Sequence, residues 1–117
     1  MWRSNQTAQN AFIERWINIH NEDSDKVLRK PILITEFGLS SKVPGYTVAK
    51  RDKFYAEVFN RIYFSASHMG ACAGGAFWQL FVEGMNNMRD GYEVIFEETP
   101  STTHLISQQS FRMSHIR

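Results

Sequence analysis

Hydrophobic residues recur along the chain at a helical period in three places. Residues 4–28 predict an amphipathic helix with Ser4 as its N-cap and one buried face, carried by Ala8, Phe12, Trp16 and Ile19, with Ile13 and Ile17 beside them. Residues 49–68 predict a second helix, which Gly70 ends. A third helix is expected from Pro100 onward, with Ser101 as its N-cap.

Two short apolar runs lie between these predicted helices. The first covers residues 32–35 and ends at Glu36, and the second covers residues 74–81. Continuous apolar runs of this length are typical of strands buried on both faces of a parallel sheet. The alternation of helix and strand therefore predicts an α/β fold with parallel strands joined by helical crossovers. Because two strands leave open sheet edges, we expect this pattern to belong to a larger sheet.

Length, composition and charge narrow the function classes. The chain has 117 residues, of which 43% are hydrophobic and 21% charged, as in a globular domain. Thirteen basic residues nearly balance twelve acidic ones. The net charge of +1 therefore does not indicate a protein that binds nucleic acid or an anionic membrane through its charge. No apolar run approaches the ~20 residues that span a bilayer, and we find no signal-peptide pattern at the N-terminus.

Residue types that bind metals or act as thiol nucleophiles are sparse. The single cysteine, Cys72, has small neighbours and no nearby basic residue, so we expect a buried, unreactive thiol. The four histidines have no metal-ligand spacing, and we expect no metal and no cofactor; they are His20, His68, His104 and His115. A glycosylation sequon begins at Asn5 and matters only if the chain is secreted.

A carboxylate and a tryptophan stand near the ends of the two predicted strands. Glu36 follows the first run, and the C-terminal ends of strands form the active site of α/β barrels. The alternative interpretation of Glu36 is a strand-end residue in a salt bridge. Trp78 could stack on the apolar face of a sugar, or it could be a core residue. The pair is compatible with a carbohydrate site.

Two further acids, Glu83 and Asp90, lie in the polar loop after the second run. Glycoside hydrolysis normally needs two carboxyl groups, which are ~5 Å apart in retaining enzymes and farther apart in inverting ones. Glu36 and Glu83 could form such a pair, but we favour the interpretation that the loop acids are solvated or support the loop.

Five motifs run in a fixed order along nearly the whole chain. They are the helical pattern with Phe12, Trp16 and His20; KPILITEFG at residues 30–38; GGAFWQL at residues 74–80; EGMNNMRDGYE at residues 83–93; and PST at residues 100–102 followed by ISQQS at residues 106–110. This series resembles the C-terminal part of plant endo-β-1,4-mannanases of glycoside hydrolase family five. The motifs at 74–80 and 83–93 are the most specific.

The resemblance implies that residues 1–117 are the C-terminal part of one (β/α)₈-barrel catalytic domain, a partial TIM barrel supplying helix six, strand seven, helix seven, strand eight and helix eight. It implies a retaining hydrolase of mannan, glucomannan and galactomannan, extracellular in the full-length family. By the same resemblance, Glu36 is the catalytic nucleophile and Trp78 lies beneath the sugar. The family's acid/base glutamate and its strand-six His and Tyr have no counterpart in this sequence.

We therefore expect a mannan endo-1,4-β-mannosidase whose C-terminal piece is this chain. Without the acid/base, and with far fewer than the roughly 250 residues of a barrel, the chain alone is expected to be inactive and poorly folded. One alternative is a non-catalytic truncated product that keeps at most sugar or partner binding. Another is an unrelated small α/β domain.

Overall fold

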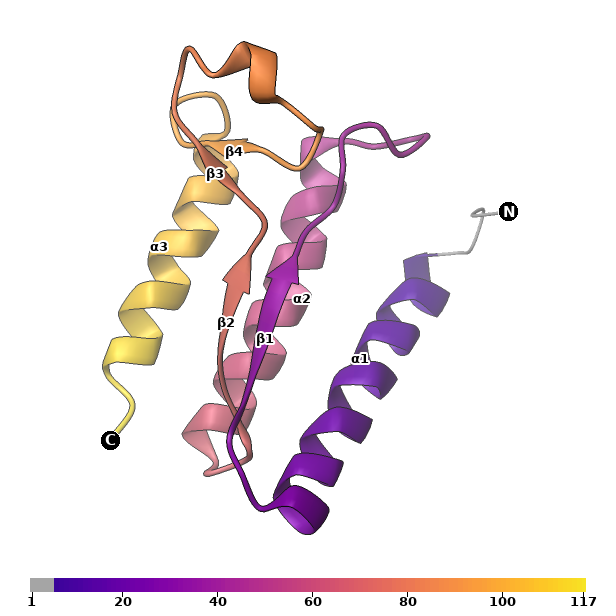
Figure 1. Ribbon diagram of the computed structural model, residues 1–117, viewed down its shortest axis with the longest axis vertical. Coiled ribbons are helices and arrows are strands. Elements are labelled where there is room, and N and C mark those ends of the chain that lie inside the picture. Colours follow the sequence, from indigo (N-terminus) through magenta and orange to yellow (C-terminus); the bar gives the residue numbers. More distant parts are fainter. Residues whose placement is uncertain (1–5) are drawn as a thin grey trace.

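The computed structural model describes residues 6–117, in which three helices accompany two small parallel sheets (Figure 1). The helices are α1 (Gln6–Asp23), α2 (Val48–Ser67) and α3 (Pro100–Ser114), with a π-helical turn η1 (Ser24–Leu28) and a 3₁₀ turn η2 (Asn86–Met88). Strands β1 (Ile32–Phe37) and β2 (Cys72–Phe77) form one sheet, and β3 (Leu80–Phe81) and β4 (Val94–Ile95) form the other. The α/β class and the parallel pairing are confirmed.

The second apolar run is not one strand, and that prediction was wrong. The run divides at the Trp78–Gln79 peptide, which is cis. Strand β2 ends before it at Phe77, and β3 begins after it at Leu80 in the other sheet. The first run, predicted over residues 32–35, continues through Glu36 to Phe37.

The core lies between α2 and the β1–β2 sheet. One face of α2 is buried there through Tyr55, Val58, Phe59 and Ile62. Phe37 of β1 meets this face, and its ring centroid lies 5.4 Å from that of Tyr55 and 5.5 Å from that of Phe59. Full burial of such a side chain contributes roughly 1.5–3 kcal/mol, so these contacts anchor the C-terminal end of β1.

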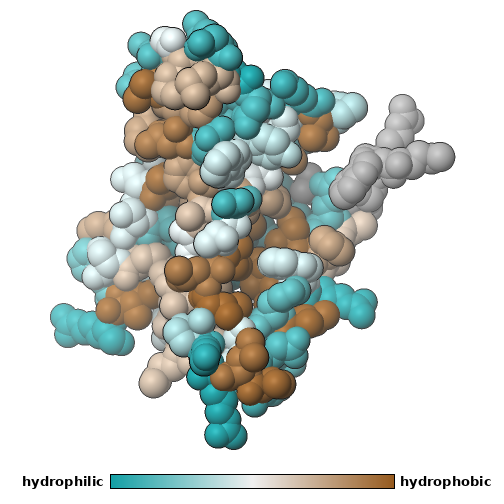
Figure 2. All heavy atoms as spheres, viewed as in Figure 1, coloured by the Kyte–Doolittle hydropathy of each residue, from teal (hydrophilic) through white to brown (hydrophobic). Residues whose placement is uncertain are grey.

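The other face of this sheet is uncovered by the described residues. Leu33 is 66% exposed, and Thr35, Ala73 and Ala76 are exposed as well. Figure 2 views the molecule from this side and shows hydrophobic side chains at its surface. Residues 6–117 therefore cover β1 and β2 on one face only, and the burial of both faces that the apolar runs led us to expect is not provided by this part of the chain.

Helix α1 packs through a different face from the predicted one. Phe12, Trp16 and Ile19 are 69%, 45% and 47% exposed, whereas Ile17 is 3% exposed. The side-chain oxygen of Asn21 accepts hydrogen bonds from the Cys72 amide at 2.8 Å and from a serine hydroxyl of α2. This polar junction, beside Ile17, fixes α1 to the start of β2. The predicted N-cap, Ser4, lies outside the described residues.

Helix α3 is joined to α2 by the hydroxyl groups of its first turn, and the predicted cap was wrong. Thr99 occupies the N-cap position, and Ser101 instead donates to the carboxylate of Asp52 at 2.5 Å. Thr102 has no exposed surface; it donates to the same carboxylate and accepts from the Arg51 guanidinium at 3.2 Å. These bonds hold the chain segment after β4 against the N-terminal turn of α2.

Candidate active site

Glu36 occupies an irregular position in β1. The sheet pairs Ile34 with Gly75 and Phe37 with Phe77, so β1 takes three residue steps where β2 takes two. Glu36 has a φ of 59°, in the left-handed region that costs a non-glycine residue roughly 1–2 kcal/mol. A bulge of this kind redirects a side chain, and bulges are frequent beside active sites. The exposed carboxylate therefore stands at the C-terminal end of the strand in a strained conformation.

The salt-bridge interpretation of Glu36 has no support among residues 6–117. The ion pairs of the described residues join Lys26 to Glu22, Arg61 to Glu14 and Glu57, and Arg89 to Glu98. None of them includes Glu36. The described part of the molecule thus leaves this carboxylate open to another partner.

Trp78 is a surface residue in this structure, 42% exposed, so the core interpretation is wrong for the described residues. Its amide donates to the carbonyl oxygen of Phe37 at 2.7 Å. The tryptophan therefore follows β2 directly and is tied to the residue after Glu36. The two site residues that the sequence singled out therefore lie at the C-terminal ends of the paired strands β1 and β2.

Gly38 allows the chain to pack closely at this edge. A Cβ atom on Gly38 would lie 2.5 Å from the carbonyl oxygen of Trp78, a distance that real Cβ atoms do not adopt. The same atom would lie 3.1 Å from Cδ1 of Tyr92, so the tyrosine ring rests against this glycine. Sequence reasoning missed both residues. The glycine directly after the Glu36–Phe37 strand end was the available signal.

The loop after β3 is braced around Asp90. One carboxylate oxygen of Asp90 accepts from the Gln79 side-chain amide at 3.2 Å, and the other accepts from the Tyr92 backbone amide at 2.9 Å. Asp90 therefore supports the loop, as we favoured from the sequence. Glu83 lies exposed between β3 and η2.

Cys72 is fully buried, and burial raises the pKa of its thiol. A raised thiol pKa disfavours the reactive thiolate, which agrees with the unreactive cysteine expected from the sequence. Within residues 6–117, no three His, Cys, Asp or Glu side chains gather closely enough to hold a metal ion. In the same part of the chain, every helix is too short or too polar to cross a bilayer.

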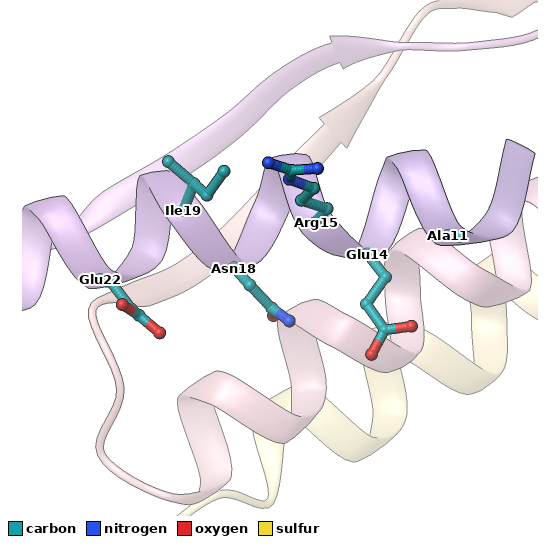
Figure 3. Close-up of a pocket in the computed structure, with 6 residues that line it drawn as sticks. All are labelled: Ala11, Glu14, Arg15, Asn18, Ile19 and Glu22. Atoms are coloured by element: carbon teal, nitrogen blue, oxygen red, sulfur yellow. The ribbon is translucent and has the colours of Figure 1, made fainter. Parts of the chain in front are cut away.

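The hollows of the surface lie elsewhere. One runs along α1, where Glu14, Asn18 and Glu22 project to one side of the helix (Figure 3). It is lined by α1 alone, and Glu14 is paired with Arg61 at 3.0 Å. Another, of about 200 Å³, lies beside Arg51 and Glu93 near the start of α2. Neither hollow includes Glu36 or Trp78, so we assign the candidate site from the strand ends.

Three plant proteins show what this chain is similar to. Mannan endo-1,4-beta-mannosidase 4 of Solanum lycopersicum is 47% identical over 111 residues, which is 95% of this chain and 28% of the relative. Mannan endo-1,4-beta-mannosidase 1 of Oryza sativa subsp. japonica is 54% identical over 106 residues, 91% of this chain and 24% of the relative. Mannan endo-1,4-beta-mannosidase 7 of Arabidopsis thaliana is 46% identical over 114 residues, which is 97% of this chain and 26% of the relative.

No protein-family model matches the chain. The chain spans about a quarter of the length of these curated relatives, although they match nearly all of it. This coverage agrees with the resemblance of the strand and loop motifs to the C-terminal part of the family. By sequence, the chain is a relative of the plant mannan endo-1,4-β-mannosidases and matches the C-terminal quarter of these proteins.

Proposed function

We propose that this chain supplies the nucleophile side of a retaining endo-β-1,4-mannanase that acts on mannan, glucomannan and galactomannan. The observation that carries the proposal is Glu36, an exposed carboxylate held at φ 59° in a bulge at the C-terminal end of β1. Strain of this kind is concentrated at functional sites. The relatives are named as mannan endo-1,4-β-mannosidases, which supports the hydrolysis of mannan as the reaction.

The chemistry assigned to Glu36 is nucleophilic. One of its carboxylate oxygens attacks the anomeric carbon of a mannosyl unit and forms a covalent ester, while the glycosidic bond breaks and the leaving oxygen takes a proton from a second carboxylic acid. Water, deprotonated by that second group, then attacks the same carbon and frees Glu36. We assign the second group to a part of the enzyme outside this chain, because Asp90 supports the loop and the family's acid/base glutamate has no counterpart in this sequence.

Trp78 is proposed to lie beneath the mannosyl unit that Glu36 attacks. Its side chain is 42% exposed beside β1, and a flat indole can cover the C–H face of a sugar ring. The amide bond to Phe37 fixes its backbone relative to the strand that carries Glu36.

We place residues 1–117 as the last part of a (β/α)₈ barrel, from helix six to helix eight. The parallel β1–β2 pair, the α2 crossover on one face and the open opposite face support this placement. In a barrel, the open face would be packed by side chains of other strands, and both outer strand edges would be paired. An extracellular location is part of the same proposal, since the substrate is a cell-wall polysaccharide.

The test is a chimera in which this chain replaces the matching quarter of the rice relative, called the rice chimera below. The rice chimera should release mannooligosaccharides from mannan, and Glu36→Gln should abolish that release because an amide is a poor nucleophile. Glu83→Gln, a matched change of an exposed glutamate in the next loop, should leave the rate within about twofold.

Near-normal hydrolysis by the Glu36→Gln chimera would refute the nucleophile assignment. Mannan binding without any turnover in the unmutated chimera would instead favour a non-catalytic sugar-binding product.

A further inference from the structure

Tyr92 presents a second partly exposed aromatic ring beside the proposed site. Its side chain is 38% exposed, close to the 42% of Trp78. Its ring rests against Gly38, two residues after Glu36, where a Cβ atom would also meet the Trp78 carbonyl. Trp78 and Tyr92 are 14 positions apart in sequence, one before β3 and the other before β4. Both nevertheless lie next to Gly38 at the C-terminal end of β1.

The backbone of Tyr92 forms hydrogen bonds with two residues, Asp90 and Gln79. Its amide donates to Asp90 at 2.9 Å, and its carbonyl oxygen accepts from the Gln79 amide at 3.3 Å. The Gln79 side chain closes the arrangement by donating to Asp90 at 3.2 Å. Glu93 accepts from the Gly91 amide at 2.7 Å and braces the same turn from the other side. The loop thus fixes the backbone of Tyr92, and the contact with Gly38 locates its ring, before any ligand arrives.

A fixed and partly exposed tyrosine is suited to binding a sugar chain. It offers a large, flat contact area with little loss of side-chain freedom on binding, because only two torsions are involved. Its phenol group also offers a hydrogen-bond donor and acceptor at the edge of that area.

We propose that Tyr92 is a second sugar-stacking residue, which binds the mannosyl unit next to the one over Trp78. This inference rests on the proposed function and deepens it, since it makes the site one for a chain of mannosyl units rather than for a single sugar. The stacking contact is carried by the ring, and the rigid loop around Asp90 orients it.

The experiment measures binding of mannohexaose to the rice chimera by calorimetry, together with KM and kcat. Tyr92→Ala should weaken binding and raise KM about tenfold, the scale of one lost stacking contact, with kcat changed less than KM. Tyr92→Phe keeps the ring and should stay within about twofold of the parent. Phe96→Ala, which removes a ring of the same 38% exposure after β4, is the matched control and should have no effect.

A second variant separates stacking from packing against Gly38. Tyr92→Leu keeps apolar bulk over the glycine but lacks a flat ring, so it should lose affinity like Tyr92→Ala while its melting temperature stays near the parent value. If Tyr92→Ala and Tyr92→Leu bind mannohexaose as well as the Phe96→Ala control, the inference is wrong.

Failure of the proposed function gives a different result. The unmutated chimera would then neither bind nor cleave mannooligosaccharides, and the Tyr92 assignment would fall with it. A parent that binds and cleaves normally, with Tyr92 variants that do the same, would overturn the Tyr92 inference alone. A loss in Tyr92→Phe as large as in Tyr92→Ala would also overturn it, because the hydroxyl rather than the ring would then bind the sugar.

Discussion

The Trp78 amide donates a hydrogen bond to the carbonyl oxygen of Phe37 at 2.7 Å. Phe37 directly follows Glu36, so this bond ties the exposed tryptophan to the end of the strand that carries the carboxylate. This contact is made by the main chain and does not depend on either side chain. Changes to the Trp78 or Glu36 side chain therefore leave the strand pairing in place, and their effects on binding and on stability can be measured separately.

Glycine at position 36 should make the protein more stable and inactive. The left-handed backbone conformation destabilises the folded state by roughly 1–2 kcal/mol when the residue is Glu36, and glycine removes this cost. Glycine also makes the unfolded chain more flexible, which lowers the free energy of unfolding by about 0.5–1 kcal/mol. We expect Glu36→Gly to raise the free energy of unfolding of the rice chimera by up to about 1 kcal/mol in urea titrations.

The matched control for this prediction is Thr35→Gly, at the neighbouring exposed position of β1, where φ is not positive. That change should destabilise the chimera by about 0.5–1 kcal/mol. Equal destabilisation by both glycines would show that position 36 is not strained.

Removing the Trp78 side chain should affect the ligand more than the fold. Because this side chain is 42% exposed, Trp78→Ala should change the free energy of unfolding by no more than about 0.5 kcal/mol. Affinity for mannooligosaccharides should fall about tenfold. Trp16→Ala, on α1 with 45% exposure, is the matched control and should leave affinity unchanged. A large drop in melting temperature with unaltered affinity would assign Trp78 a structural role.

Tyr55 should make the fold sensitive to alkali. Its side chain has no exposed surface, and its hydroxyl has no hydrogen-bond partner among the described residues. Burial is the largest cause that raises the pKa of Tyr55 from 10.0 to about 12. Between these values the unfolded chain has lost the phenol proton while the folded chain keeps it, so stability falls as pH rises from about 10 to 12.

Tyr55→Phe removes this titration. The variant should match or exceed the parent at pH 8, since no hydrogen bond is lost there, and its advantage should grow between pH 10 and 12. Urea unfolding of both chimeras across this range gives the comparison. Parallel stability curves for the two proteins would contradict the assigned pKa.

The 117-residue chain expressed alone should neither hydrolyse mannan nor fold to a unique monomer. Its sheet has one uncovered face with Leu33 66% exposed, and α1 exposes Phe12 at 69%. Exposed apolar surface and unpaired strand edges favour association. We expect aggregation in light scattering and poorly dispersed amide NMR spectra. A soluble monomer with a sharp cooperative melt would disprove the folding half, and mannan hydrolysis lost in Glu36→Gln would disprove the catalytic half.

Local pattern predicted the elements well and their surroundings poorly. The helical period located α2 within one residue at each end, and the apolar runs located the start of β1. The buried face of α1 was misjudged, because Trp16 and Ile17 lie on neighbouring stripes and only tertiary contacts decide between them. The helical period of hydrophobic residues cannot show which face of the helix packs against the rest of the protein.

The candidate site shows the same division. Glu36 and Trp78 could be found from the sequence because Glu36 directly follows the first apolar run and Trp78 lies toward the end of the second. The break at Trp78–Gln79 could not, since Leu80 and Phe81 resume the apolar pattern directly after Gln79, although they belong to a different sheet. Tyr92 was missed because its place beside Gly38 depends on a loop braced by Asp90, and no local period encodes that contact.

The bulge at Glu36 has a counterpart near the start of the sheet. Ile32 pairs with Cys72 but Leu33 pairs with Gly74, so β2 takes one extra step before β1 takes its own. The two irregularities cancel, and the strands are level again at Phe37 and Phe77. A one-residue deletion in either strand would shift the nucleophile position against the tryptophan by about 3.3 Å, the rise of one strand residue. Only a paired deletion, one in each strand, would restore the alignment, so the position of Glu36 relative to Trp78 depends on the lengths of both strands together.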